Sequence, residues 1–303
     1  MKDILIVGTG GVGGSIAGFL ALDGHNVTCI ARGEHLKAIR ERGLHLKSDL
    51  KGERYISVKA CTTDEYNGKA DIIFVCVKGY SLDDSIKNVI EKAAKEDTLV
   101  VPILNVYGTG TRISRMVPNV NVLDGCIYIV GFVSDKGEIT QMGKVFRLIF
   151  GARKEAPIAI QRLEEIRDML VKSGIKADIS DDINRDTFVK WAFISAMACT
   201  GAYHDVNMGA LQHQGEERNT FIGLSEESAQ IARKCGIIFK NEPVTYNLSV
   251  IDKLDPHSTA SMQKDIAKGH QSEIKGLLFD MIELGEKLGV DMPTYRKVEK
   301  KFM

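Results

Sequence analysis

A glycine-rich run near the amino terminus is the first set of residues whose types and spacing could do chemistry. Residues 8–13, GTGGVG, directly follow an apolar stretch and open a helical one that reaches about Leu22. Glycines in this pattern allow a tight turn, close approach of the backbone to a pyrophosphate, and close packing of helix on strand. The helix amino terminus adds unpaired N–H groups and partial positive charge. We therefore expect a dinucleotide, rather than a bare turn or a ligand such as S-adenosylmethionine, at Gly8, Gly10, Gly11, Val12 and Gly13.

Arg32 follows the second apolar run, residues 26–31. This is the position at which a dinucleotide-binding fold contacts the adenosine ribose. An NAD site usually has Asp or Glu there to accept the 2′-hydroxyl. A guanidinium can instead bind a 2′-phosphate through two parallel hydrogen bonds, so Arg32 favours NADP(H). Two alternatives stay open: Arg32 is a solvated surface residue, or the strand ends later and Glu34 is an NAD-type acceptor.

Two polar residues directly follow later apolar runs. Lys78 comes after residues 72–77, and Asn105 comes after residues 99–104. In open α/β sheets the ligand lies beyond the carboxyl ends of the strands, so both are candidates for a binding site. Each could equally be an ordinary polar loop residue.

Lys190 is the most unusual charged residue of the second half. It precedes residues 191–203, which contain no charged side chain, so it lies at the start of a helix that is apolar on all faces and therefore buried. Burial of a lysine disfavours its charged form and can make it a general acid near neutral pH. The alternative is a buried stem with an ammonium that reaches water.

Further along, hydroxyl side chains cluster before a predicted helix, and a carboxylate follows. Ser261 and Glu273 are separated by Gly269, and this spacing is compatible with both facing one cleft from adjacent helices. Glu273 directly precedes an apolar stripe. Carboxylates are also common at helix starts simply because the helix dipole stabilises negative charge there. A purely structural role for Glu273 therefore stays open.

The candidate residues must be positioned by helices and strands, and the first part of the chain has the pattern of an α/β domain. Short β-branched runs alternate with helical stretches up to about residue 179, which predicts an α/β fold with a doubly wound parallel sheet covered on both faces. Strands are expected over residues 4–7, 27–31, 72–77, 99–104 and 120–123, with a small hairpin between residues 44 and 61. Residues 127–133 and 144–150 are expected to extend the sheet at its far edge.

After residue 181 the strand pattern stops. Helices are expected over residues 183–200, 217–235, 258–270 and 273–288. The last shows an i, i+3, i+4 apolar stripe and ends before Gly289 and Pro293. We therefore predict an α/β domain over residues 1–181 and an all-helical domain over residues 182–303.

Composition excludes several classes of protein. The 303 residues include 40 Lys and Arg against 40 Asp and Glu, with both signs interspersed. This balance argues against a nucleic-acid partner and gives no reason to expect an anionic membrane surface. No apolar run approaches the ~18 residues that span a bilayer, and the first is too short for a signal peptide, so we expect a cytoplasmic protein.

The cysteines point to no special chemistry. The six are widely scattered, with no C-x-x-C pair and no clustered histidines. Neither a disulfide framework nor a metal site is expected, and buried reduced thiols are the simpler interpretation.

Together these residues resemble the ketopantoate reductase (2-dehydropantoate 2-reductase) family over nearly the whole chain. The most specific part is the block with Ser258, Ser261, Met262, Asp265 and Glu273. The resemblance implies a Rossmann domain, a helical substrate domain, NADPH as hydride donor, and a 2-oxo acid reduced to a 2-hydroxy acid.

The same resemblance implies roles for individual residues. Lys190 matches the catalytic lysine that polarises and protonates the ketone oxygen, and Glu273 the acid that hydrogen-bonds in the active site. Ser261 matches the serine that holds the substrate carboxylate. Lys78 and Asn105 match residues near the nicotinamide, and Asn105 is also expected to contact the substrate.

This chain departs from the family pattern at several positions. Ile194 and Ala198 stand where the family has asparagines that bind a substrate hydroxyl, and Asn207 is offset by one from another family asparagine. Val106 replaces a glycine, and Lys275 replaces an acid. A site that loses polar partners for a hydroxyl discriminates less in its favour, so the reaction class is better supported than the exact substrate.

Three hypotheses follow. The first is NADPH-dependent reduction of ketopantoate to pantoate, in pantothenate biosynthesis. The second is reduction of a different 2-oxo acid, and the third is an NADP(H)-binding protein whose catalytic cleft has decayed. A small-molecule substrate is expected in the first two, and a homodimer is an open possibility that the residues do not decide.

Overall fold

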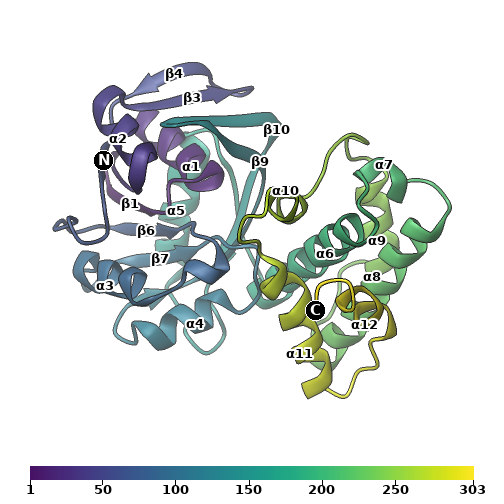
Figure 1. The fold of residues 1–303 in the computed structure, drawn as a ribbon. Helices are drawn as coiled ribbons and strands as arrows, with labels where there is room; N and C mark the ends of the chain where they lie inside the picture. Colours follow the sequence, from purple (N-terminus) through teal and green to yellow (C-terminus); the bar gives the residue numbers. More distant parts are fainter. The chain divides into compact units, whose positions relative to one another are not determined.

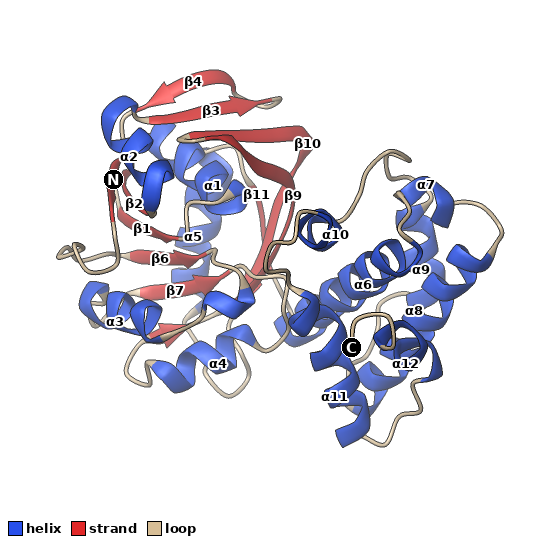
Figure 2. Cartoon of the chain, in the orientation of Figure 1, coloured by secondary structure: helices blue, strands red, loops and turns tan.

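The computed structural model of the protein describes residues 1–303, which divide into two compact units. Unit 1 consists of Met1–Leu104 and Gly108–Ile183, and unit 2 of Asn105–Tyr107 and Asn184–Met303. Unit 1 contains all the strands, whereas unit 2 is built from helices and loops (Figures 1 and 2). The short segment Asn105–Tyr107 thus belongs with helices that follow much later in the chain.

Unit 1 contains the predicted parallel sheet. Its six strands lie in the order β5-β2-β1-β6-β7-β8, and every neighbouring pair is parallel. The strands are β1 (Asp3–Val7), β2 (Asn26–Ile30), β5 (Lys59–Cys61), β6 (Ile72–Val75), β7 (Leu99–Pro102) and β8 (Asn121–Val122). The connecting helices are α1 (Gly11–Leu22), α2 (Gly33–Arg42), α3 (Asp84–Ala93) and α4 (Thr109–Met116), with a 3₁₀ turn at Gly79–Ser81.

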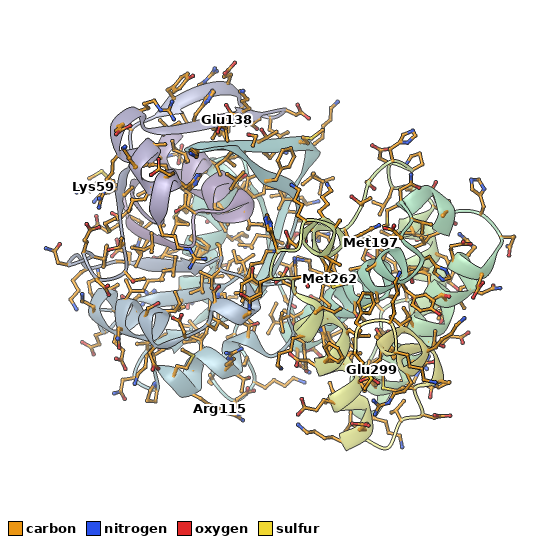
Figure 3. The ribbon with its side chains drawn as sticks, in the orientation of Figure 1. Lys59, Arg115, Glu138, Met197, Met262 and Glu299 are labelled. Carbon is orange, nitrogen blue, oxygen red and sulfur yellow. The ribbon has the colours of Figure 1, made fainter.

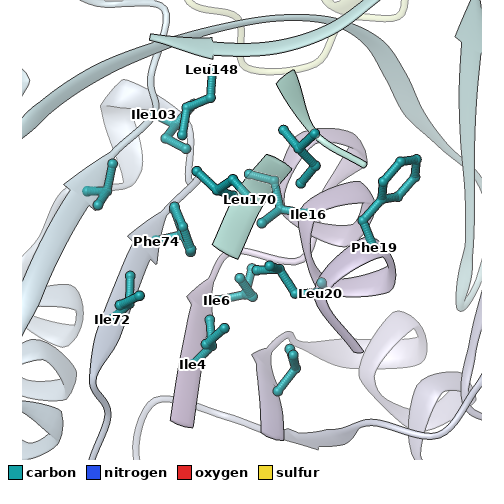
Figure 4. Packing of buried hydrophobic residues seen from close by; sticks show 14 of the residues in the cluster. Ile4, Ile6, Ile16, Phe19, Leu20, Ile72, Phe74, Ile103, Leu148 and Leu170 are labelled. Carbon is teal, nitrogen blue, oxygen red and sulfur yellow. The ribbon is translucent and has the colours of Figure 1, made fainter. Parts of the chain in front are cut away.

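Alternate residues of the central strands pack on opposite faces of this sheet. Ile4 and Ile6 of β1 join Ile16 and Phe19 of α1 in one apolar cluster (Figure 4). Leu5 and Val7, the alternate residues of β1, belong to a second cluster with α3. Because both faces are covered, the central strands β6 and β7 and residues 4–7 of β1 are apolar, and this confirms the doubly wound α/β fold.

Unit 1 also contains a second sheet, which is not among the predicted features. Its path is β11-β10-β3-β4, and β9 pairs with β10. The elements are β3 (Leu44–Ser48), β4 (Gly52–Ile56), β9 (Asp124–Asp135), β10 (Glu138–Gly151) and β11 (Lys176–Ile179), with α5 (Ile160–Lys172) before the last. The expectation that residues 127–133 and 144–150 extend the first sheet is therefore wrong. An apolar pattern shows where a strand lies in the chain, but it does not show which strand lies next to it. Here β10 lies parallel to β3.

Unit 2 is helical, as predicted. Its elements are α6 (Ile183–His204), α7 (Met208–Leu211), α8 (Glu216–Lys234), α9 (Pro243–Ile251), α10 (Ser261–Ala267), a π-helical turn (Lys275–Phe279), α11 (Asp280–Lys287) and α12 (Pro293–Glu299). Pro243 and Pro293 each occupy a first helical position, where proline costs no hydrogen bond. α7, α9 and α12 lie outside the predicted helices, and Pro293, predicted only to end a helix, begins α12. None of the helices is both long and apolar enough to cross a membrane.

Candidate active site

The glycine loop connects β1 to α1, and its neighbours require glycine at most positions. Gly8 has φ +99°, and a Cβ there would lie 2.8 Å from Val77 Cγ1. A Cβ on Gly11 would lie 2.2 Å from the carbonyl oxygen of Gly131 in β9. A Cβ on Gly13 would lie 2.0 Å from the carbonyl oxygen of Gly8. The loop thus packs closely against the residues that follow β6, against β9 and against its own helix.

Gly10 is different, because a Cβ there would meet no atom within 4 Å. The amino terminus of α1, which Gly10 precedes, has no side-chain cap. Open space beside a backbone turn, facing uncapped helix N–H groups, fits a pyrophosphate. Val12, in the first turn of α1, is the other predicted cofactor-binding residue of the loop.

Arg32 and Lys78 lie in the same unit, each next to the end of a strand. Arg32 is exposed and directly precedes α2, whose amino terminus has no side-chain cap. Because β2 already ends at Ile30, the later strand end that would favour Glu34 is not observed, and Glu34 lies in the first turn of α2. Lys78 is half-buried after β6, next to the Val77 that packs on Gly8.

In unit 2 the structure brings Lys190 and Asn105 together. Nζ of Lys190 donates a hydrogen bond of 2.8 Å to Oδ1 of Asn105. The lysine side chain, in the second turn of α6, is only 5% exposed. A buried ammonium needs polar partners, and the Asn105 amide oxygen is one of them.

Aromatic side chains hold the Asn105–Tyr107 segment against α6. The ring of Tyr107 stacks on Trp191, with centroids 5.5 Å apart and an angle of 15° between the planes. It also meets the edge of Phe188, and its hydroxyl donates to Asn184 Oδ1. Tyr107, Phe188 and Trp191 are not among the predicted site residues. Phe188 and Trp191, which flank Lys190 in the sequence, could have indicated an aromatic cluster. Their partner Tyr107 lies far from them in the sequence and gives no such indication.

Glu273 is 4% exposed and lies just before the π-helical turn Lys275–Phe279. Two carbonyls of that turn accept hydrogen bonds from α6: Trp191 Nε1 donates to Gly276 at 2.9 Å, and Ser195 Oγ donates to Leu277. The predicted helix from residue 273 is present over residues 274–287, but residues 275–279 are π-helical rather than α-helical. Such turns leave carbonyls available and often occur at functional sites. These bonds fix the segment that carries Glu273 against the helix that carries Lys190.

Ser261 is the first residue of α10 and is exposed, whereas the adjacent Met262 is fully buried. Met262 belongs to the apolar cluster of unit 2, against which Met197 of α6 also packs; both are labelled in Figure 3. Burial of Met262 therefore anchors α10 and fixes the place of Ser261. A shared cleft for Ser261 and Glu273 stays a prediction.

The face of α6 that begins with Lys190 continues as an apolar surface. Ile194 and Met197 are half-buried and Ala198 is buried, one to two turns after the lysine. Residues three, four, seven and eight apart share a helix face, so no polar side chain accompanies Lys190 there. No group of three or more His, Cys, Asp or Glu side chains is placed to hold a metal ion.

Two family models match the chain. Ketopantoate reductase PanE/ApbA matches residues 4–155, and its C-terminal counterpart matches residues 182–299. The protein belongs to the ketopantoate reductase family. This confirms the family predicted from the glycine loop and the Ser258–Glu273 block, and it makes the protein a member of a family of oxidoreductases.

Relatives of this family cover almost the whole chain. An uncharacterized oxidoreductase, YkpB, of Bacillus subtilis (strain 168) is 28% identical over 297 residues, which is 97% of this chain and 95% of the relative. A 2-dehydropantoate 2-reductase of Pyrococcus horikoshii is 27% identical over 292 residues, covering 96% and 93%. The ternary structure of D-mandelate dehydrogenase with NADH and anilino(oxo)acetate has a TM-score of 0.88 at 23% identity, covering 98% and 96%. At this identity the structural match shows the fold alone.

Proposed function

We propose that the protein reduces ketopantoate (2-dehydropantoate) to pantoate with NADPH. The observation that carries this proposal is the buried ammonium of Lys190, held by Asn105 at 2.8 Å. Reduction of a ketone develops negative charge on its oxygen, and a fixed ammonium can stabilise that charge and donate the proton. Lys190 is thus the general acid of the proposed mechanism.

The residues of unit 1 fit the cofactor. We assign residues 1–181 to NADP(H) binding: the loop Gly8–Gly13 would hold the pyrophosphate, Arg32 the 2′-phosphate, and Lys78 would lie toward the nicotinamide. When bound, NADPH supplies a hydride to the ketone carbon. The product takes this hydride on carbon and a proton on oxygen, so a 2-oxo acid becomes a 2-hydroxy acid.

Residues 182–303 carry the substrate in this proposal, together with Asn105. Lys190 donates to the ketone oxygen, and Asn105 keeps Nζ in place. Ser261 receives the substrate carboxylate, and Glu273 hydrogen-bonds in the site. The exposed hydroxyl of Ser261 at the start of α10 leaves it available to an anion.

A reductase of a different 2-oxo acid is the second candidate. The apolar residues Ile194 and Ala198 after Lys190 favour it, because α6 offers no partner there for a substrate hydroxyl. An apolar pocket separates substrates with and without a hydroxyl poorly. The D-mandelate dehydrogenase of similar fold was solved with a different oxo acid and with NADH.

Steady-state kinetics with a panel of 2-oxo acids tests these candidates. We expect NADPH oxidation with ketopantoate, at a kcat/KM within ~10-fold of that with 2-oxo acids of similar size without a hydroxyl, because α6 offers no polar partner for the hydroxyl. Rapid reduction of another 2-oxo acid, with ketopantoate inactive, would transfer the proposal to the second candidate. Tight NADPH binding without turnover on any acid would indicate the decayed, non-catalytic alternative.

Two further proposals concern the protein in the cell. We place it in the cytoplasm, where NADPH and a small 2-oxo acid are available, and we propose a homodimer as its assembly. Analytical ultracentrifugation at micromolar concentration tests the second: sedimentation at the mass of one 33.4 kDa chain would exclude a stable dimer.

A further inference from the structure

His35 in α2 connects the glycine loop to a distant turn. One ring nitrogen, Nε2, lies 2.9 Å from the carbonyl oxygen of Thr9, inside the loop. The other, Nδ1, accepts a hydrogen bond of 2.9 Å from the backbone N–H of Gly137, in the turn between β9 and β10. The ring therefore bridges two backbone groups that belong to different elements.

The bridge fixes the protonation state of the ring. The N–H of Gly137 can only donate, so Nδ1 must be unprotonated, and Nε2 must then carry the proton that it donates to Thr9. A doubly protonated ring would keep the bond to Thr9 but would direct a second N–H at the N–H of Gly137. The geometry is thus compatible only with neutral His35.

Thr9 has its other polar groups occupied as well. Its N–H donates to the carbonyl of Ile30 at 3.1 Å, its hydroxyl donates to the same carbonyl at 2.9 Å, and it is 4% exposed. Thr9 lies between Gly8 and Gly10, so the plane of the peptide that leads into Gly10 depends on where the Thr9 carbonyl points. His35 is the group that holds this carbonyl.

The other end of the bridge is equally fixed. Gly137 has φ +77°, and a Cβ there would lie 2.9 Å from the Cβ of Ala38 in α2. Its carbonyl accepts from the N–H of His45 at 2.9 Å. The same hairpin presses the backbone of Gly131 against Gly11. The turn is therefore held in place by its own contacts, and its bond to His35 fixes the ring that holds the Thr9 carbonyl.

We propose that neutral His35 is a positioning residue for the phosphates of the dinucleotide, and that its protonation loosens the loop and weakens cofactor binding below neutral pH. This inference rests on the proposed role of the loop in binding NADP(H). The proposed role of His35 requires no contact with a phosphate, because it acts through the carbonyl of Thr9.

The surroundings of the ring support a neutral state at pH 7. Burial lowers the pKa of His35 below its ordinary value of 6.5, and the hydrogen bond to the Thr9 carbonyl opposes this only in part. The charged residues nearest to it in sequence are Glu34 and Lys37 of α2 and Arg32 just before that helix, and those of the turn are Asp135 and Lys136. None of these five contributes to the shift. The bridge is therefore intact at neutral pH and is lost as the pH falls through the lowered pKa.

The test measures NADPH affinity by fluorescence titration between about pH 5 and pH 8, across the titration range of histidine. His35→Gln places an amide oxygen and an amide N–H where the two ring nitrogens lie, and it does not titrate. We expect wild-type affinity at the upper pH and, at the lower pH, a smaller loss than the wild type shows. His35→Leu removes both bonds and should weaken binding ~10-fold throughout.

Controls separate this effect from others. The 2′-phosphate of NADPH itself titrates near pH 6, but it does so equally with every variant. His25→Gln is the matched control: the pKa of His25 is also lowered by burial, but its Nδ1 accepts from the Lys2 N–H, away from the loop. Affinity of His25→Gln should follow the wild-type pH profile.

The outcomes are distinct. A His35→Gln profile identical to that of the wild type, or a His35→Leu affinity equal to that of the wild type, would overturn the inference and leave the proposed function standing. A wild-type protein that binds neither NADPH nor NADH at any pH would instead remove the proposed function. A flatter profile for His35→Gln alone supports the inference.

Discussion

Lys190 illustrates how much of a single residue's chemistry can be predicted from its own sequence neighbours. The uncharged stretch after it predicted burial, and the side chain is indeed only 5% exposed. Its partner Asn105 lies 85 positions away, and the predicted role of that asparagine came from its place after a strand. Their hydrogen bond could not be predicted, because it joins two distant segments, and the stacking of Tyr107 on Trp191 that also joins them is equally non-local.

Replacing Lys190 by alanine should lower kcat by ~100-fold or more, since this is the usual scale of general acid catalysis. Affinity for NADPH should change much less, because the cofactor phosphates are assigned to unit 1. Steady-state kinetics at saturating NADPH gives the comparison. Lys264→Ala, an exposed lysine on α10, is the control and should retain wild-type kcat. An unchanged kcat in folded Lys190→Ala would remove this residue from the mechanism.

Arg32→Ala should weaken NADPH binding by ~10-fold or more and leave NADH nearly unaffected, because only NADPH carries the 2′-phosphate that a guanidinium binds. Titrations of both cofactors against the same protein measure the ratio. Lys37→Ala removes an exposed positive charge from the same helix and controls for general electrostatics. Equal losses for both cofactors would contradict the assignment of Arg32 to the 2′-phosphate.

At the scale of elements, the strand–loop–helix unit around the glycine loop was predicted well, because a glycine pattern after an apolar run is a local signal. The second sheet was not. β10 pairs with β3, and the bulge between Met142 and Phe146 shifts its register with β9. Such pairings join segments far apart in sequence, and no periodicity within either segment indicates them.

The glycine loop allows a paired prediction. Gly10→Ala introduces a Cβ with no neighbour within 4 Å, at a φ of −81° that alanine accepts, so stability should change by less than about 0.5 kcal/mol. The same methyl group would occupy the space assigned to the pyrophosphate, so NADPH affinity should fall ~10-fold or more. Urea denaturation and cofactor titration measure the two effects.

Gly11→Ala is the matched counterpart, because its Cβ would lie 2.2 Å from the Gly131 carbonyl oxygen. We expect a loss of about 1–3 kcal/mol in the free energy of unfolding, as β9 must move away from α1. If Gly10→Ala were as destabilised as Gly11→Ala, or if it bound NADPH normally, the open space at Gly10 would have no role in cofactor binding.

At the scale of the whole molecule, each unit has its own hydrophobic core. The clusters around α1 and α3 belong to unit 1, and a separate cluster around α6 and α8 belongs to unit 2. The change from alternating strands and helices to helices alone is visible in the sequence. Membership of Asn105–Tyr107 in unit 2 is not, since it depends on aromatic contacts with α6.

These separate cores predict that the units respond unequally to a partial ligand. The NADP fragment 2′-phospho-ADP-ribose lacks the nicotinamide and should contact only unit 1, through the loop and Arg32. At about 100 times its Kd it should stabilise that unit by about 2.7 kcal/mol. Unit 2 should be stabilised far less, because a ligand stabilises the cooperative unit that binds it.

The chain contains a single tryptophan, which makes the measurement direct. Trp191 is buried in the core of unit 2, so its fluorescence during urea unfolding follows that unit alone. Hydrogen exchange of β1 and β6, measured in the same urea series, follows unit 1. The fragment should raise the urea midpoint of β1 and β6 and leave the Trp191 midpoint nearly unchanged. In Gly10→Ala, whose affinity is expected to be ~10-fold lower, the same concentration of fragment should stabilise unit 1 by only about half as much, about 1.4 kcal/mol. Equal increases for the two probes in the wild type would mean that the two cores unfold as one cooperative unit.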